Sequence, residues 1–129
     1  MATRMASRLE DFFDRRTNGN LRSIVKYEQE EFEIVYLRND VAEQYGPESI
    51  EKAVDDSRME SLTTAIYSDI FSDDHGEPTC LVKCFENVVE MNFVLSTGVG
   101  AAVALDAEAM SETRGLVSEA RDIVVQERE

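Results

Sequence analysis

The sequence predicts an α+β fold: a single five-stranded antiparallel sheet with helices, in the order α-β-β-α-β-β-β-α. Two stretches near the start alternate apolar and polar residues on either side of a short polar turn. Three more strand-like runs follow residue 79, and apolar patterns of helical period lie before, between and after the two groups. With 129 residues and no repeat or linker, residues 1–129 are expected to form a single domain.

The first helix and the hairpin after it follow from side-chain spacing. Residues 1–16 predict a short amphipathic helix, ended by the Thr-Asn-Gly-Asn of residues 17–20. Residues 21–28 and 32–38 predict two strands of a β-hairpin, joined through the polar Glu-Gln-Glu-Glu between them. In the first strand, alternation places four side chains on one face: Leu21, Ser23, Val25 and Tyr27.

The middle of the chain is predicted to be helical. Residues 39–45 suit a short helical turn, which Gly46 and Pro47 interrupt. The next run predicts either one long helix or two helices with a break near residues 55–57, followed by an exposed loop at residues 72–78. Its apolar positions are Ile50, Ala53, Val54, Met59, Leu62, Ala65, Ile66 and Ile70.

Three strands and a helix complete the predicted order. The strands are expected at residues 80–85, 88–95 and 99–105, and the last is apolar enough to be central. Asp106 is expected to cap a helix over residues 107–126. Packing in layers places the middle helix on one face of the sheet and the terminal helices in another layer.

The charge excludes some classes of function. The formal net charge is −14, so binding to nucleic acid is disfavoured by repulsion from phosphate. The 13 basic residues comprise 10 Arg and 3 Lys, and an acidic, lysine-poor surface suits molar salt, where screening shortens to about 3 Å. We interpret this composition as that of a protein from the cytoplasm of a halophile. The alternative is an ordinary acidic protein. No apolar run suits a signal peptide or membrane span, so no membrane association and a cytoplasmic location are expected.

The two cysteines are not expected to act together. Cys80 and Cys84 lie in a predicted strand, in which four residues span roughly 13 Å. A disulfide requires Cα atoms within about 7 Å, and a shared zinc ion is unfavourable for the same reason. Both are therefore interpreted as small, buried apolar side chains.

The sequence indicates no catalytic residue, no cofactor site and no metal site. His75, the single histidine, lies among carboxylates, but the segment lacks the spacing of a calcium loop and suits a solvated turn. A serine triad would have to use that same histidine, and no nucleophile elbow is present. Gly98 and Gly100 resemble the start of a dinucleotide fingerprint, but a strand follows them instead of a helix.

One group of side chains is a candidate interaction surface. Tyr27 and Tyr36 are predicted to be cross-strand neighbours in the hairpin, with Arg22 and Arg38 nearby. Exposed Tyr and Arg are enriched in interfaces. Ordinary cross-strand packing is the alternative, and it is the favoured one.

The element order resembles that of roadblock/dynein-light-chain domains and their longin and profilin-like relatives. That resemblance implies a non-catalytic scaffold that associates by joining sheet edges, in some cases to regulate small GTPases. The chain also resembles small acidic haloarchaeal proteins with no assigned activity, over roughly residues 20–110. Three segments carry this second resemblance: LRSIVKYEQEEFEIVYLRNDVAEQYG, CLVKCFENVVEMNF and GVGAAVALDAEA.

These observations favour a non-enzymatic interaction or regulatory module that acts through protein–protein association. We expect a homodimer, together with a protein partner that the sequence does not identify. The alternative is a small sensor domain that binds a metabolite between sheet and helix. An enzyme ranks third because no chemical motif is present, and a nucleic-acid binder ranks fourth because of the charge.

Overall fold

The computed structural model describes residues 2–129, apart from the side chains of Ser68 and Ser72. The predicted first helix included Met1, which lies outside the described residues. The helices are α1 (Ala2–Arg16), α2 (Asn39–Gln44), α3 (Pro47–His75), the 3₁₀ segment η1 (Ala107–Glu112) and α4 (Thr113–Arg128). The strands are β1 (Leu21–Glu28), β2 (Glu31–Leu37), β3 (Cys80–Cys84), β4 (Val88–Ser96) and β5 (Val99–Asp106).

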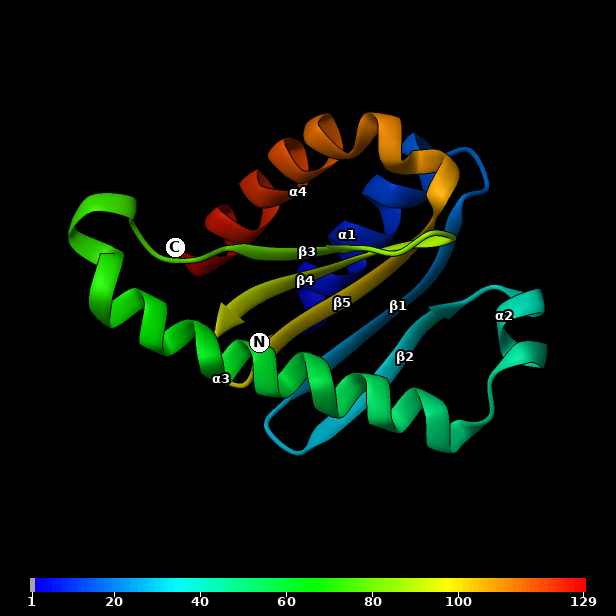
Figure 1. Ribbon diagram of the computed structural model, residues 1–129, viewed down its shortest axis with the longest axis horizontal. Helices are drawn as coiled ribbons and strands as arrows, with labels where there is room; N and C mark the ends of the chain where they lie inside the picture. Colours follow the sequence, from blue (N-terminus) through cyan, green and yellow to red (C-terminus); the bar gives the residue numbers. More distant parts are fainter. Residues whose placement is uncertain (1) are drawn as a thin grey trace.

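The five strands form one antiparallel sheet in the order β2-β1-β5-β4-β3 (Figure 1). The α+β class and the single five-stranded antiparallel sheet are therefore confirmed. The pairing of β1 with β5 joins the two groups of strands, with β5 at the centre of the sheet and β1 beside it. The edges are β2 and β3.

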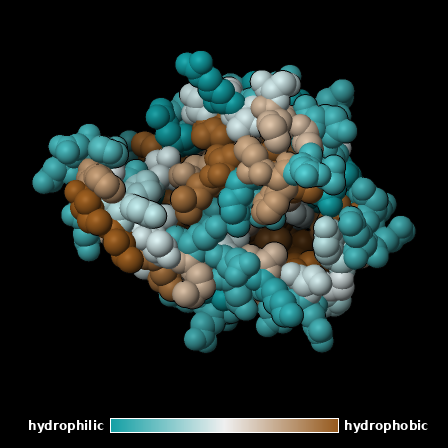
Figure 2. Space-filling view, viewed as in Figure 1, coloured by the Kyte–Doolittle hydropathy of each residue, from teal (hydrophilic) through white to brown (hydrophobic). Residues whose placement is uncertain are grey.

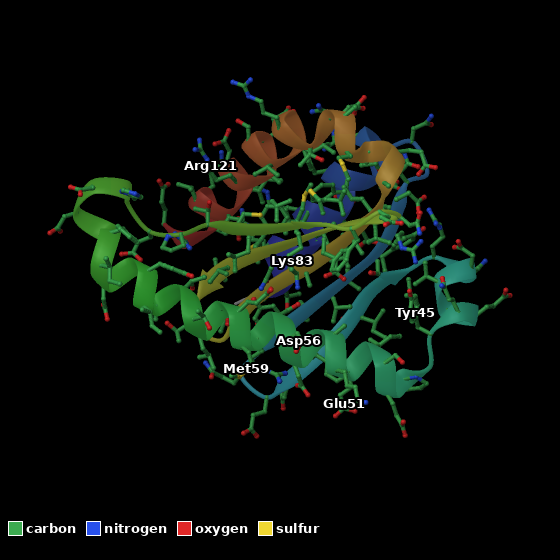
Figure 3. The ribbon with its side chains drawn as sticks, in the orientation of Figure 1. Tyr45, Glu51, Asp56, Met59, Lys83 and Arg121 are labelled. Carbon is green, nitrogen blue, oxygen red and sulfur yellow. The ribbon has the colours of Figure 1, made fainter. Side chains whose placement is uncertain are left out.

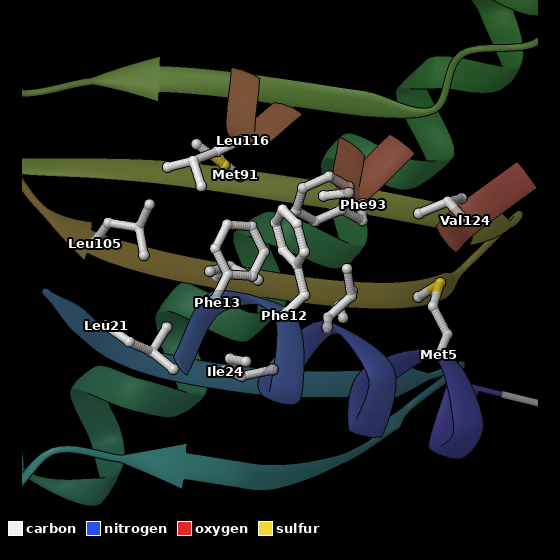
Figure 4. Packing of buried hydrophobic residues seen from close by; sticks show 14 of the residues in the cluster. Met5, Phe12, Phe13, Leu21, Ile24, Met91, Phe93, Leu105, Leu116 and Val124 are labelled. Carbon is white, nitrogen blue, oxygen red and sulfur yellow. The ribbon is translucent and has the colours of Figure 1, made fainter. Parts of the chain in front are cut away.

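One face of the sheet carries most of the apolar core. Helices α1 and α4 pack against it, and Phe13 of α1 meets Phe93 of β4 with 6.0 Å between ring centroids. Figure 4 shows side chains of both helices interleaved with those of the central strands. Burial of apolar surface on this face is the main term that stabilises the fold.

Helix α3 lies across the other face. Figure 1 shows α3 crossing the sheet and continuing past the ends of β4 and β5. The cluster of buried residues beneath it consists of Val25, Tyr27 and Val54, with Ile50 packed alongside. Because this apolar interface is small, α3 depends on polar contacts as well. Among residues 2–129, no helix is both long enough and apolar enough to cross a membrane.

A bulge in β1 changes the faces predicted for the first strand. The pairing of β1 with β5 shifts between Leu21 and Ser23. Leu21 therefore joins Ile24 in the core under α1 and α4, whereas Val25 and Tyr27 lie under α3. Strict alternation was wrong here because a bulge inserts one residue and reverses the faces beyond it.

Of the two alternatives for the middle of the chain, one long helix is confirmed: α3 has no break near residues 55–57. Two further expectations are corrected. Helix α3 runs to His75, so most of the predicted loop at residues 72–78 is helical. The stacking of His75 on Phe71, at 4.9 Å between centroids, accompanies this last turn. Asp106 precedes η1 but makes no side-chain capping bond, because its carboxylate is engaged by arginines.

Candidate functional site

Small and polar side chains occupy the interface between α3 and the sheet. The sheet-facing positions of the helix include Ser57, Ser61 and Thr64, which are buried. Each hydroxyl donates a hydrogen bond to a carbonyl of its own helix, as buried hydroxyls require. Of the three, Ser57 lines the open space between helix and sheet.

A polar network links this face of the sheet to the helix. The Tyr27 hydroxyl donates to Oδ1 of Asn92 at 2.7 Å. The Asn92 amide in turn donates to the Ser57 carbonyl at 2.9 Å and to Oε1 of Glu60 at 3.2 Å. Burial raises the pKa of Tyr27 to about 12, so this phenol stays protonated and remains a donor.

A cation lies between two carboxylates at the β3 side of α3. Nζ of Lys83 is 2.9 Å from Oε2 of Glu60 and 3.4 Å from Oε1 of Glu90. Burial opposes the charge of Lys83, but the hydrogen bond and charge of Glu60, with Glu90, outweigh burial and raise its pKa. The ammonium therefore stays charged.

A cleft of about 550 Å³ opens between α3 and the sheet. Its floor includes Ser23, Ala102 and Ala104 of the central strands, and its helical wall includes Ile50 and Ala53. Figure 2 shows this hollow with a hydrophobic floor and a largely hydrophilic rim, and Figure 3 labels Lys83 and Tyr45, which line it from β3 and from beside α2. The cleft exists because small side chains face each other across the layer.

The opposite side of α3 is apolar and exposed. We call four of its side chains the outer stripe: Met59, Leu62, Ile66 and Ile70. At about 100° per residue, these four lie opposite Ser57, Ser61 and Thr64. Helix α3 thus buries hydroxyls and exposes aliphatic side chains, which reverses the usual amphipathic arrangement.

The outer stripe is the strongest exposed apolar feature among the described residues. Ile66 and Ile70 are 59% and 64% exposed, and Tyr67 and Phe71, on other sides of the same part of the helix, are also exposed. Figure 2 shows hydrophobic side chains along the far half of α3. Contiguous exposed apolar side chains of this kind mark interaction sites.

The candidate interaction surface predicted from the hairpin is not assembled as expected. Tyr27 pairs with Phe32 and Tyr36 pairs with Ile24, so the two tyrosines are not cross-strand neighbours. Tyr27 is fully buried under α3, whereas Tyr36 packs at the core of the opposite face. The expectation of a shared tyrosine face was wrong because the pairing of β1 with β2 shifts between Ile24 and Val25, which places Tyr36 on the face opposite to that of Tyr27.

The two arginines predicted for that surface do come together, on Asp106. Nη1 and Nη2 of Arg38 lie 2.6 Å and 2.9 Å from the two carboxylate oxygens, and Nη1 of Arg22 lies 3.2 Å from one of them. Arg38 also donates to the Gly19 carbonyl and pairs with Asp40. This cluster fastens the end of β2 to the end of β5, which gives both arginines a structural role.

The Asp106 cluster predicts a dependence of stability on pH. Hydrogen bonding from Arg38, helped by Arg22 and opposed by burial, lowers the pKa of Asp106. A lowered folded-state pKa contributes stability above the unfolded value, about 3.9, which is lost as pH falls through the folded value. We expect Asp106→Asn to lower the free energy of unfolding by about 1–2 kcal/mol at neutral pH. Urea titrations across pH should show this difference shrinking below about pH 4, and a constant difference would contradict the assignment.

Both cysteines are free, as the predicted strand geometry requires. Cys80 packs beside the main core, and burial raises the pKa of its thiol to about 12. Cys84 is exposed on β3, so the expectation that both are buried holds only for Cys80. An uncharged buried thiol behaves as a small apolar group.

The outer stripe and the cleft were not recognised from the sequence. The apolar positions of α3 form two groups on opposite sides of the helix, and the prediction treated them as one. Ile50 and Val54 face the sheet, whereas Met59, Leu62, Ile66 and Ile70 do not. The signal that could have separated them is the spacing of Ser57, Ser61 and Thr64, which continues the inward face with hydroxyls.

Residues 7–125 match the family described as Domain of unknown function (DUF7522). The chain belongs to the DUF7522 family. The match includes every strand and α3, so both the outer stripe and the cleft lie within the region that defines DUF7522. Neither the curated proteins nor the solved structures that were compared gave a match to this chain.

Proposed function

We propose that this chain is a non-enzymatic interaction module that self-associates through the outer stripe of α3. The observation that carries the proposal is the reversed amphipathicity of this helix. Full burial of one aliphatic side chain is worth about 1.5–3 kcal/mol. Four such side chains facing solvent are an unused source of association free energy.

A second copy of the chain fits this surface by symmetry. A two-fold axis near residue 64 would pack two α3 helices antiparallel, with Met59 against Ile70 of the partner subunit and Leu62 against Ile66 of the partner subunit. The far half of α3 extends past the sheet (Figure 1), which leaves room for a helix beside it. The roadblock resemblance also implies association, there through sheet edges, and β3 is an edge strand beside α3.

Charge makes this association dependent on salt. Each copy carries a net charge of −14, so two copies repel in dilute buffer. In molar KCl screening shortens to about 3 Å, while apolar burial persists. Self-association that strengthens with salt suits the salt-adapted cytoplasm that we propose from the excess of Arg over Lys. Association with a basic partner would instead weaken with salt.

The test is sedimentation of stripe variants in molar KCl. We expect the wild-type chain to dimerise, and Ile66→Glu to raise the dimer dissociation constant by about a hundredfold or more, because each dimer loses two buried isoleucines. The fold should be unaffected, since Ile66 is exposed.

Val125→Glu is the matched control. Val125 is 40% exposed on α4, outside the outer stripe, and the same change there should leave the dissociation constant unaltered. A wild-type chain that sediments as a monomer in molar KCl would contradict the proposal. An Ile66→Glu chain that dimerises like wild type would contradict it as well.

A further inference from the structure

We propose that the cleft between α3 and the sheet binds a small organic cation with an apolar body. This site is separate from the outer stripe, which lies on the other side of the same helix. The inference rests on the shape of the cleft, on its apolar floor and on the balance of charges around it.

The shape suits a small molecule. Sites for small ligands typically enclose about 300–1,000 Å³ with mostly apolar walls and a few polar groups, and this cleft has about 550 Å³. The space is a consequence of sequence. On β5, Ala102 and Ala104 face α3, whereas Val103 and Leu105 fill the core on the opposite face.

The walls combine apolar side chains with charged groups, some of which gather at the β3 end. Val25, Val54 and Ile50 offer apolar contact near the middle of the cleft. Glu60 and Glu90 hold the Lys83 ammonium at the β3 end. The two glutamates at that end already bind the Lys83 ammonium. Their carboxylates can also bind a cationic ligand, either beside that ammonium or in its place.

The charges on the cleft wall favour a cation over an anion. The acidic side chains on the wall are Glu60, Glu86 and Glu90, against the basic Arg22 and Lys83. The guanidinium of Arg22 is paired with Asp106. The remaining charged side chains on the cleft wall therefore carry a surplus of negative charge. The net charge of −14 adds to this surplus. An anionic ligand would therefore meet repulsion at the site.

Three probes of one shape test the preference for charge: 1-naphthylmethylamine, 1-naphthalenemethanol and 1-naphthoate. We expect the amine to bind about tenfold or more tighter than the carboxylate at low salt, with the alcohol between them. NMR shift mapping on wild type should place the amine at the amides of Ala102 and Ala104. The amine should also raise the melting temperature, because it binds the folded state.

Two variants test the location of the site. Ala102→Leu fills the cleft and should abolish binding of the amine. Lys83→Met removes the resident ammonium and should tighten binding about fivefold or more, because Glu60 and Glu90 lose their partner. Since Lys83 is partly exposed at the sheet edge, this second variant stays informative even if Ala102→Leu folds poorly.

Ile66→Glu is the matched control that distinguishes binding in the cleft from binding at the outer stripe. It changes the outer stripe and should leave binding of the amine unaltered, so failure of the dimer proposal and failure of this one are separable. Equal affinity for the three probes would overturn the proposal. Shifts confined to residues of the outer stripe, or wild-type affinity in Ala102→Leu, would overturn it too.

Discussion

Replacing Gly100 by alanine is expected to lower the free energy of unfolding by about 3 kcal/mol, because a Cβ there has no room. Gly100 lies in the central strand β5, between β1 and β4. An added Cβ would overlap the carbonyl oxygen of Phe93 and lie 2.6 Å from the hydroxyl of Tyr27. The carbonyl belongs to a hydrogen-bonded backbone, which cannot move aside without loss of sheet pairing.

Urea denaturation of paired glycine variants measures this effect. Gly115→Ala is the matched control: Gly115 lies in α4 with nothing within 4 Å of its Cβ position. There alanine should raise stability by up to about 1 kcal/mol through helix propensity. Adding Tyr27→Phe to Gly100→Ala should recover only part of the loss, since the clash with Phe93 remains. A Gly100→Ala protein as stable as wild type would show that the two strands are further apart than described.

Asn92→Leu is expected to destabilise the protein by about 2–3 kcal/mol, because it disrupts the network that holds α3. Asn92 accepts from Tyr27 and donates to Ser57 and Glu60. Leucine has a similar volume but provides no acceptor for the buried phenol. The apolar cluster beneath α3 is small, so little else compensates for the loss.

A double-mutant cycle isolates the buried pair. Tyr27→Phe alone should cost about 1 kcal/mol, and the double variant with Asn92→Leu should lose less than the sum of the two, since no phenol is then left without its acceptor. Amide hydrogen exchange should show faster opening in α3 than in α1 and α4 in the Asn92→Leu protein. Additive losses, or uniform exchange across all helices, would contradict a network that acts between sheet and helix.

Local patterns predicted most of the elements. Strands β1 and β4 begin where alternation places them, β5 begins with the predicted apolar run at residue 99, and β3 begins at the predicted residue 80. Alternation succeeds for a strand that is buried on one face, and a continuous apolar run succeeds for a central strand that is covered on both faces. A sheet with apolar side chains on both faces needs a helical layer on each face. This requirement predicted that α1 and α4 pack on one face and α3 on the other.

The candidate site could not be predicted in the same way. Its cleft depends on β1 pairing with β5, which brings Val25 opposite Ala102 from 77 positions away in the sequence (102 − 25 = 77). It also depends on the bulge near Ser23, which decides which side chains of β1 face α3. Neither pairing nor bulge leaves a periodic signal in the chain.

The sequence by itself determined most of the helical and extended segments, the overall acidity and the capacity of α3 to be apolar on two sides. Those properties are local, because they depend on side-chain chemistry and on spacing within a single element. Only the tertiary structure decided that Tyr27 is buried, that Arg22 and Arg38 meet at Asp106, and that the aliphatic side of α3 faces outward. The physical reason is that each of these outcomes requires contact between segments far apart in the chain, and burial is set by those contacts.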